Sequence, residues 1–170
     1  MLKDTIKEDM KTAFKAGDTV TRGTLTMLLS VIQNRELEKR AKLMKSGAVA
    51  EVEVAEKSQL TDEEVVEAIS TEIKKRKDAA AQYEAAGRTE LSAGETTEAA
   101  ILMKYMPEQM SEDAVKALIA QAIAETGAAG LTGKAGAKDM GRVMGAVAPK
   151  TKGKFDGSRL NALVKEALGA

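Results

Sequence analysis

Apolar residues recur at three- and four-residue spacing along most of the chain, a pattern typical of helices with one buried face. Two such stripes flank a lysine-rich connection near the end of the sequence: Met140, Val143, Met144 and Val147, then Leu160, Leu163, Val164 and Leu168. We call residues 149–157 the basic turn. We expect Pro149 to end the first of these helices, because proline lacks the amide hydrogen. Asp156 or Ser158 can cap the second helix, with Gly157 supplying conformational freedom.

The first part of the chain predicts two helices. One runs from Leu2 and ends at Gly17, and the other begins after Asp18 or Thr19 and continues to about Lys45. The main apolar stripe of the second helix lies in its first half: Leu25, Leu28, Leu29 and Ile32. Because the residues beyond Ile32 are mostly polar, we expect the second half to project as a solvated helix.

Residues 46–60 form a predicted connector. Thr61 and Glu64 then make a capping box, which begins a third helix that Gly87 ends. Arg76 falls inside the apolar seam of this helix. An arginine in such a place pairs with a carboxylate or extends to solvent, and a contact surface is the alternative.

The next helical region covers about 89–105, where Gly94 can introduce a kink. Residues 99–103 are apolar all round, which predicts burial on several sides. Pro107 marks a boundary, and Ser111 caps a helix that Gly127 ends. We expect residues 127–137 to form a flexible, glycine-rich loop. Its spacing excludes a phosphate-binding loop, since Ala135 stands where a serine or threonine belongs.

These periodicities define an all-α fold, because no segment alternates at period two for long enough to be a convincing strand. We expect an N-terminal antiparallel helical bundle over residues 1–95 and a smaller, compact helical unit over residues 96–170.

Composition excludes several kinds of chemistry. The chain contains no cysteine and no histidine, so a thiolate zinc site and a Ser-His-Asp triad are excluded. With four aromatic side chains and no tryptophan, a base-stacking platform is a weak interpretation. We expect no cofactor, no metal site and no catalytic residue. The amphipathic start of the chain carries acidic residues, and no apolar run approaches ~20 residues. These features predict a cytoplasmic protein without a membrane segment.

The zero net charge hides a marked polarity. Segment 51–67 carries seven acids and one base, whereas segment 130–160 carries seven bases and two acids. Lysine-rich turns beside helix ends attract phosphate, although many such turns are simply solvated surface. The candidate nucleic-acid-binding residues are Lys138, Arg142, Lys150, Lys152, Lys154 and Arg159.

Several strings of this sequence resemble the YqeY family. They are EIKKRKD at 72–78, ILMKYMPEQ at 101–109 and KDMGRVMG at 138–145, followed by PK at 149–150 and DGS at 156–158. Their order and approximate spacing match the family over nearly the whole chain. The resemblance implies two different all-helical subdomains.

The resemblance also implies a functional context. YqeY proteins look like the C-terminal part of the GatB component of the glutamyl/aspartyl-tRNA amidotransferase, whose helical and tail domains hold the tRNA. The family is associated with carbon–nitrogen ligase activity that uses glutamine as amido donor. In the amidotransferase, that chemistry lies in a separate domain and in another polypeptide of the complex.

Three functions remain open at this point. The first is a noncatalytic module that binds tRNA or another structured RNA through the basic stretch at residues 138–159. The second is an interaction scaffold, in which the acidic segment 51–67 and the polar second half of the second helix bind a protein partner or a second copy. The third is an enzyme of the amidotransferase kind, for which the sequence offers no recognisable ATP or glutamine site.

Overall fold

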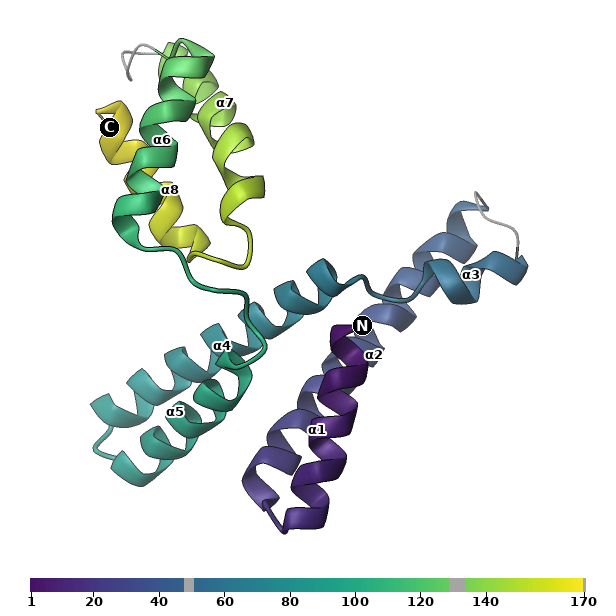
Figure 1. Ribbon diagram of the computed structural model, residues 1–170. Coiled ribbons are helices and arrows are strands. Elements are labelled where there is room, and N and C mark those ends of the chain that lie inside the picture. The colour runs from purple at the N-terminus through teal and green to yellow at the C-terminus, as the bar shows by residue number, and fades with distance from the viewer. Residues whose placement is uncertain (48–50, 129–133, 170) are drawn as a thin grey trace. The chain divides into compact units, whose positions relative to one another are not determined.

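The computed structural model describes residues 1–47, 51–128 and 134–169, and all regular elements in these ranges are helices (Figure 1). The fold is therefore all-α. It divides into two compact units, which we call the N-terminal unit (Met1–Met106) and the C-terminal unit (Pro107–Ala170). The boundary expected at residue 95 falls inside a helix, whereas the two units divide after Met106.

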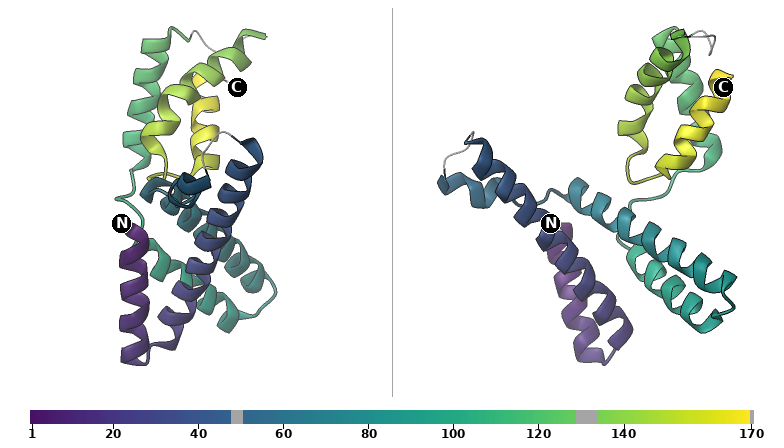
Figure 2. Two further views of the ribbon diagram at one scale, coloured as in Figure 1. Left: turned by 90° about the vertical axis from the view of Figure 1, so that its right-hand side faces the viewer. Right: turned by 180° about the vertical axis from the view of Figure 1, so that it is seen from behind.

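The N-terminal unit contains the first five helices: α1 (Leu2–Ala16), α2 (Thr19–Ser46), α3 (Glu51–Lys57), α4 (Asp62–Ala85) and α5 (Thr89–Met103). Helices α1 and α2 lie side by side, as do α4 and α5 (Figures 1 and 2). One apolar core joins the two pairs, and its largest fully buried members are Ile6, Leu25, Leu28, Ile32, Ile69 and Leu102. Each such side chain contributes about 1.5–3 kcal/mol through burial.

Most of the predicted helix ends in this unit are confirmed. Gly17 adopts a left-handed conformation with φ 72° after α1, and Asp18 caps α2 by accepting a hydrogen bond from the Thr21 amide. The capping box at Thr61 is complete, because the Glu64 side chain also accepts from the Thr61 amide at 2.8 Å. These signals succeed because each depends on residues within one turn of the helix.

No residue of α2 beyond Ile32 is buried, which agrees with the expected solvated second half, but this half also has a neighbouring helix. The connector that we expected over 46–60 contains helix α3, which lies alongside the second half of α2 (Figures 1 and 2). In addition, Lys39 of α2 donates to both carboxylate oxygens of Glu64, at 2.9 and 2.7 Å. The sequence analysis missed α3 because a seven-residue helix is too short to show its own periodicity.

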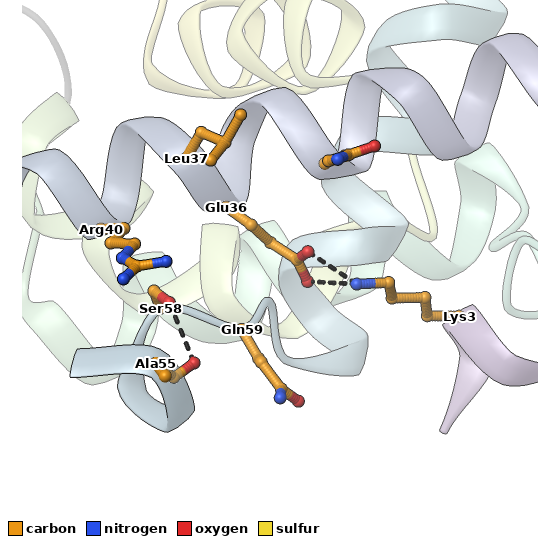
Figure 3. Close-up of a pocket in the computed structure, with 8 residues that line it drawn as sticks. Lys3, Glu36, Leu37, Arg40, Ala55, Ser58 and Gln59 are labelled. Carbon is orange, nitrogen blue, oxygen red and sulfur yellow. Dashed lines mark hydrogen bonds and ion pairs between the residues drawn. The ribbon is translucent and has the colours of Figure 1, made fainter. Parts of the chain in front are cut away.

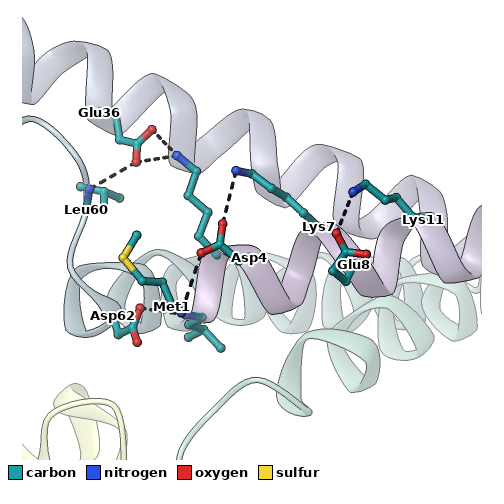
Figure 4. Close-up of polar contacts among 10 residues, drawn as sticks. Met1, Asp4, Lys7, Glu8, Lys11, Glu36, Leu60 and Asp62 are labelled. Atoms are coloured by element: carbon teal, nitrogen blue, oxygen red, sulfur yellow. Dashed lines mark hydrogen bonds and ion pairs between the residues drawn. The ribbon is translucent and has the colours of Figure 1, made fainter. Parts of the chain in front are cut away.

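Polar contacts tie the start of α1 to this region (Figure 4). The Lys3 ammonium donates to both carboxylate oxygens of Glu36, at 2.7 and 2.6 Å, and the Leu60 amide donates to the same carboxylate at 3.2 Å. The Leu2 amide donates to Asp62 at 2.8 Å. The N-terminal helix is thereby attached to both α2 and the beginning of α4.

Helix α5 is continuous through Gly94, with no break at that position. In its apolar run, Ala99, Ile101 and Leu102 are buried, which agrees with the expected burial on several sides, whereas Met103 is 37% exposed. One side of this run therefore faces solvent, because α5 packs against neighbours on its other side.

The C-terminal unit contains α6 (Glu112–Thr126), α7 (Lys134–Thr151) and α8 (Gly157–Leu168), each in contact with the other two. Its core is aliphatic, and its fully buried members include Val115, Ile119, Val143, Val147 and Val164. Ser111 caps α6 and Gly127 ends it with φ 62°, as predicted. The loop expected over 127–137 is shorter, because residues 134–137 already belong to α7, and residues 129–133 lie outside the described part.

Candidate nucleic-acid interface

Helix α7 runs through Pro149 and ends at Thr151, so the prediction that Pro149 ends it is wrong by two residues. Proline removes one amide donor, and a helix tolerates that loss more easily in its last turn than in its middle. The buried Thr151 hydroxyl also donates to the Val147 carbonyl oxygen at 3.1 Å, which satisfies one carbonyl at the helix end. Lys150 consequently belongs to the last turn of α7, where the basic turn begins.

The glycine that gives the basic turn its freedom is Gly153, with φ 72°, and not Gly157, which is the first residue of α8. A side chain at Gly153 would favour a different backbone conformation. Both backbone amides that follow, Lys154 and Phe155, donate to the Thr151 carbonyl oxygen at 2.9 and 3.0 Å. The basic turn is therefore compact and closely attached to the end of α7.

Residues 109–110, just before α6, also hold the basic turn in place through hydrogen bonds. The Gln109 side-chain amide donates to the Gly153 carbonyl oxygen at 3.0 Å, and the Met110 amide donates to the Lys154 carbonyl oxygen at 2.8 Å. Asp156 then caps α8 by accepting from the Arg159 amide at 2.7 Å. These contacts fix the backbone from which the lysine side chains project.

Lys150, Lys152 and Lys154 are all exposed around the basic turn. Lys150 and Lys154 have no carboxylate within ion-pair distance in the described part of the chain. Lys150 lies in the last turn of α7, where the helix dipole also favours a cation. The basic turn thus presents at least two ammonium groups that no carboxylate of the described chain neutralises.

Arg159 lies next to the basic turn but is engaged in a structural contact. Its guanidinium donates two hydrogen bonds to the Glu112 carboxylate of α6, at 3.0 and 2.8 Å. Hydrogen bonds from Arg159 and Lys116 lower the pKa of Glu112 to about 2. The first role of Arg159 is therefore to join α8 to α6.

The structure does not bring Arg142 to the basic turn. This side chain lies eight residues before Lys150 on the same helix, about 12 Å along the axis, and its guanidinium is 3.7 Å from Asp139. The side chain of Lys138 lies outside the described residues. Of the six candidates, the three lysines at 150, 152 and 154 are the ones that gather in one place.

Sequence reasoning missed Gln109 and Glu112, the two residues that position the basic turn and Arg159. Neither has a local signal for such a role, because their partners lie 44 and 47 residues away. Gln109 does stand inside one of the strings that resemble the YqeY family.

The geometry defines a class of protein: an all-α chain of two helical units, with a rigid, lysine-bearing turn in the second. The profile of the Yqey-like protein family matches residues 43–168, from the end of α2 to the end of α8. The chain therefore belongs to the YqeY family. No curated protein matches the chain as a relative.

Two kinds of feature are absent from the described residues. None of their helices has the length together with the apolar character that crossing a membrane requires. The same part of the chain contains no group of three or more acidic side chains placed to hold a metal ion.

Proposed function

We propose that this protein is a noncatalytic module that binds tRNA or another structured RNA in the cytoplasm, through the phosphate backbone. The observation that carries the proposal is the pair of exposed lysines, Lys150 and Lys154, on a turn that Gln109 and Met110 hold in place. Ammonium groups on a fixed backbone recognise phosphate by charge and position, and need no aromatic platform. The likeness of the family to the tRNA-holding part of an amidotransferase supports the choice of ligand.

The surroundings of the lysines favour a small phosphate footprint. Arg159 is committed to Glu112, and Arg142 lies about two turns away on α7. We therefore expect two or three phosphate contacts, with Lys150 and Lys154 contributing most and Lys152 adding to them. Such a footprint gives a modest affinity that depends on salt and little on sequence.

The test is a fluorescence-anisotropy titration of bulk tRNA with the full chain at ~50 and ~200 mM salt. We expect Lys150→Glu with Lys154→Glu to weaken binding on the order of tenfold at the lower salt. The same variant should flatten the slope of log affinity against log salt by about 1.5, since each phosphate contact contributes roughly 0.7–0.9.

The matched control is Lys42→Glu with Lys165→Glu. It changes the net charge equally, at two exposed lysines outside the basic turn. Equal weakening by both double variants would mean that binding depends on overall charge and would contradict the proposal. Glutamine hydrolysis by the purified chain above a buffer blank would contradict its noncatalytic part.

A second candidate function, a protein-interaction scaffold, is favoured by a different observation. Three large apolar side chains near the connection between α1 and α2 are exposed: Phe14 by 62%, Val20 by 50% and Met27 by 58%. Val20 and Met27 lie seven residues apart on α2 and therefore share one face of that helix, and exposed apolar side chains on one face are typical of contact surfaces. If this function holds, Val20→Ser with Met27→Ser should abolish recovery of a specific partner, or of a dimer by light scattering, and leave tRNA binding unchanged.

A further inference from the structure

The N-terminal unit contains a small polar cavity between α1, α2 and the end of α3, with a volume of about 280 Å³ (Figure 3). This volume is slightly below the ~300–1,000 Å³ of typical ligand pockets. It therefore admits a small molecule. Most of its lining comes from α1 and α2, before the range that matches the family profile.

One side of the cavity is a completed ion pair. The Lys3 and Glu36 side chains are only 19% and 16% exposed and lie 2.6 Å apart. The Glu36 carboxylate also accepts from the Leu60 amide, so three donor contacts satisfy it. This pair adds no net charge to the cavity, and its role is to hold α1 on α2.

Arg40 gives the cavity its unbalanced charge. Figure 3 shows its side chain extending from α2 into the space above Ser58. It is exposed, and no carboxylate or other acceptor in the described part of the chain engages its guanidinium. Its fork of N–H donors matches the two oxygens of a carboxylate, and this pairing is stronger than a neutral hydrogen bond.

The remaining lining complements a polar ligand with a short apolar part. The side-chain amides of Gln33 and Gln59 can each donate and accept a hydrogen bond. The Ser58 hydroxyl already donates to the Ala55 carbonyl oxygen at 3.0 Å, so its oxygen remains an acceptor. Leu37 is 54% exposed and provides an apolar wall.

We propose that this cavity binds a small monocarboxylate that also carries a hydroxyl or amide group. The carboxylate pairs with Arg40, the second polar group bonds to Gln59 or Gln33, and the aliphatic part contacts Leu37. The cavity carries a net charge of about +1 from its lining, which suits a single negative charge. Phosphate is less suitable, because it carries about 1.5 to 2 negative charges near neutral pH, whereas the lining offers one unbalanced cation.

The test is an NMR titration of the ¹⁵N-labelled full chain with sodium 3-hydroxybutyrate, against sodium chloride at equal ionic strength. We expect saturable shifts of the Arg40 Nε–Hε signal and of the Gln59 side-chain amide. Their midpoint should be on the order of 10 mM, as one charge-assisted pair and a few neutral hydrogen bonds allow. No shift, a shift linear in concentration, or the same shift with chloride would overturn the proposal.

Variants assign the effect to the guanidinium. Arg40→Gln should raise the midpoint about tenfold, and Arg40→Lys, which keeps the charge but loses the fork, should lie between it and the wild type. The control is Arg35→Gln, because Arg35 lies on the same helix but donates to Thr71, at 3.2 Å, outside the cavity. Equal midpoints for Arg40→Gln and wild type would overturn the proposal, as would inorganic phosphate shifting the same signals at a lower concentration.

Discussion

The two units differ in what lies at the centre of their helix packing. In the N-terminal unit, Arg76 and Glu72 of α4 are 5% and 7% exposed, and the Arg76 guanidinium donates to Glu72 at 3.1 Å and to Glu98 of α5 at 2.9 Å. In the C-terminal unit, the buried polar residue of the described core is Thr151, which bonds within its own helix. The first unit has a charged contact between helices where the second has aliphatic packing.

The contrast indicates how each unit specifies its helix pairing. A buried ion pair adds little net stability, because desolvation offsets the attraction, but removing one partner leaves an unpaired charge. The Arg76 contact therefore penalises any other register of α5 on α4. The C-terminal unit depends on side-chain shape and on the hydrogen bonds that hold the basic turn.

The largest effect is expected for Arg76→Ala. This substitution leaves Glu72 with Lys75 alone, removes the arginine from Glu98, which is 34% exposed, and empties the space of a large buried side chain. These losses together should lower the free energy of unfolding by about 3–5 kcal/mol. Urea unfolding followed by tyrosine fluorescence reports the free energy of unfolding of the N-terminal unit, since both tyrosines, Tyr83 and Tyr105, lie in that unit.

The matched control for that experiment is Lys74→Ala, an exposed cation two residues away on the same helix. It should change the unfolding free energy by less than about 0.5 kcal/mol. Similar losses for the two variants would show that Arg76 acts as a surface charge and would remove the contrast between the units.

Leu163→Ala tests the aliphatic unit. Leu163 is 2% exposed in the core of the C-terminal unit, and its truncation should cost about 2–4 kcal/mol through lost burial and a cavity. Circular dichroism at 222 nm should show the loss, while the tyrosine transition stays in place because this unit has no tyrosine. A tyrosine transition that moved equally would mean that the two units unfold together.

Helix caps should be equivalent in the two units. Asp156→Ala removes the cap of α8 and Thr61→Ala removes that of α4, and each should cost about 1 kcal/mol. Tyrosine fluorescence measures the loss for Thr61→Ala in the N-terminal unit, and circular dichroism at 222 nm measures the loss for Asp156→Ala in the C-terminal unit. A loss at Thr61 several times larger than that at Asp156 would show that the Thr61 contact supports more than its own helix.

The smallest effect concerns pH. Because Arg159 and Lys116 lower the pKa of Glu112 to about 2, from 4.5, its ionised form stabilises the folded C-terminal unit. This contribution is complete above about pH 4.5 and is lost as the pH falls towards 2. Glu112→Gln should lose that part of the acid dependence of the thermal midpoint. An unchanged dependence between pH 4.5 and 2 would contradict the role of this pair.

Much of the fold could be predicted because its signals are local. Gly17, Thr61 and Ser111 mark helix ends through contacts within a few residues, and each prediction is confirmed. Helix α3 was missed because seven residues give too little periodicity. The prediction that Pro149 ends its helix was wrong, because the effect of proline depends on whether it stands in the middle or in the last turn of a helix.

The position of the candidate lysines in the fold also follows from a local pattern, whereas their role in binding stays a prediction. Lysines at alternating positions between two stripes gather in space because the connection is short. Arg142 belongs to the same stretch of sequence but is carried away by the rise of α7. A count of basic residues along a stretch of sequence therefore does not show which of them lie close together in the folded protein.

Periodicity, capping and composition were enough to establish the all-α class, most helix ends and the lysine-rich turn, and the residue strings carried the resemblance to the YqeY family. These properties act over a few residues, so the chain displays them before it folds. Packing of the helices, in contrast, pairs Arg159 with Glu112, brings Arg76 to Glu98 and leaves Arg40 beside an open cavity. Those outcomes join residues from different helices, and no local pattern encodes them.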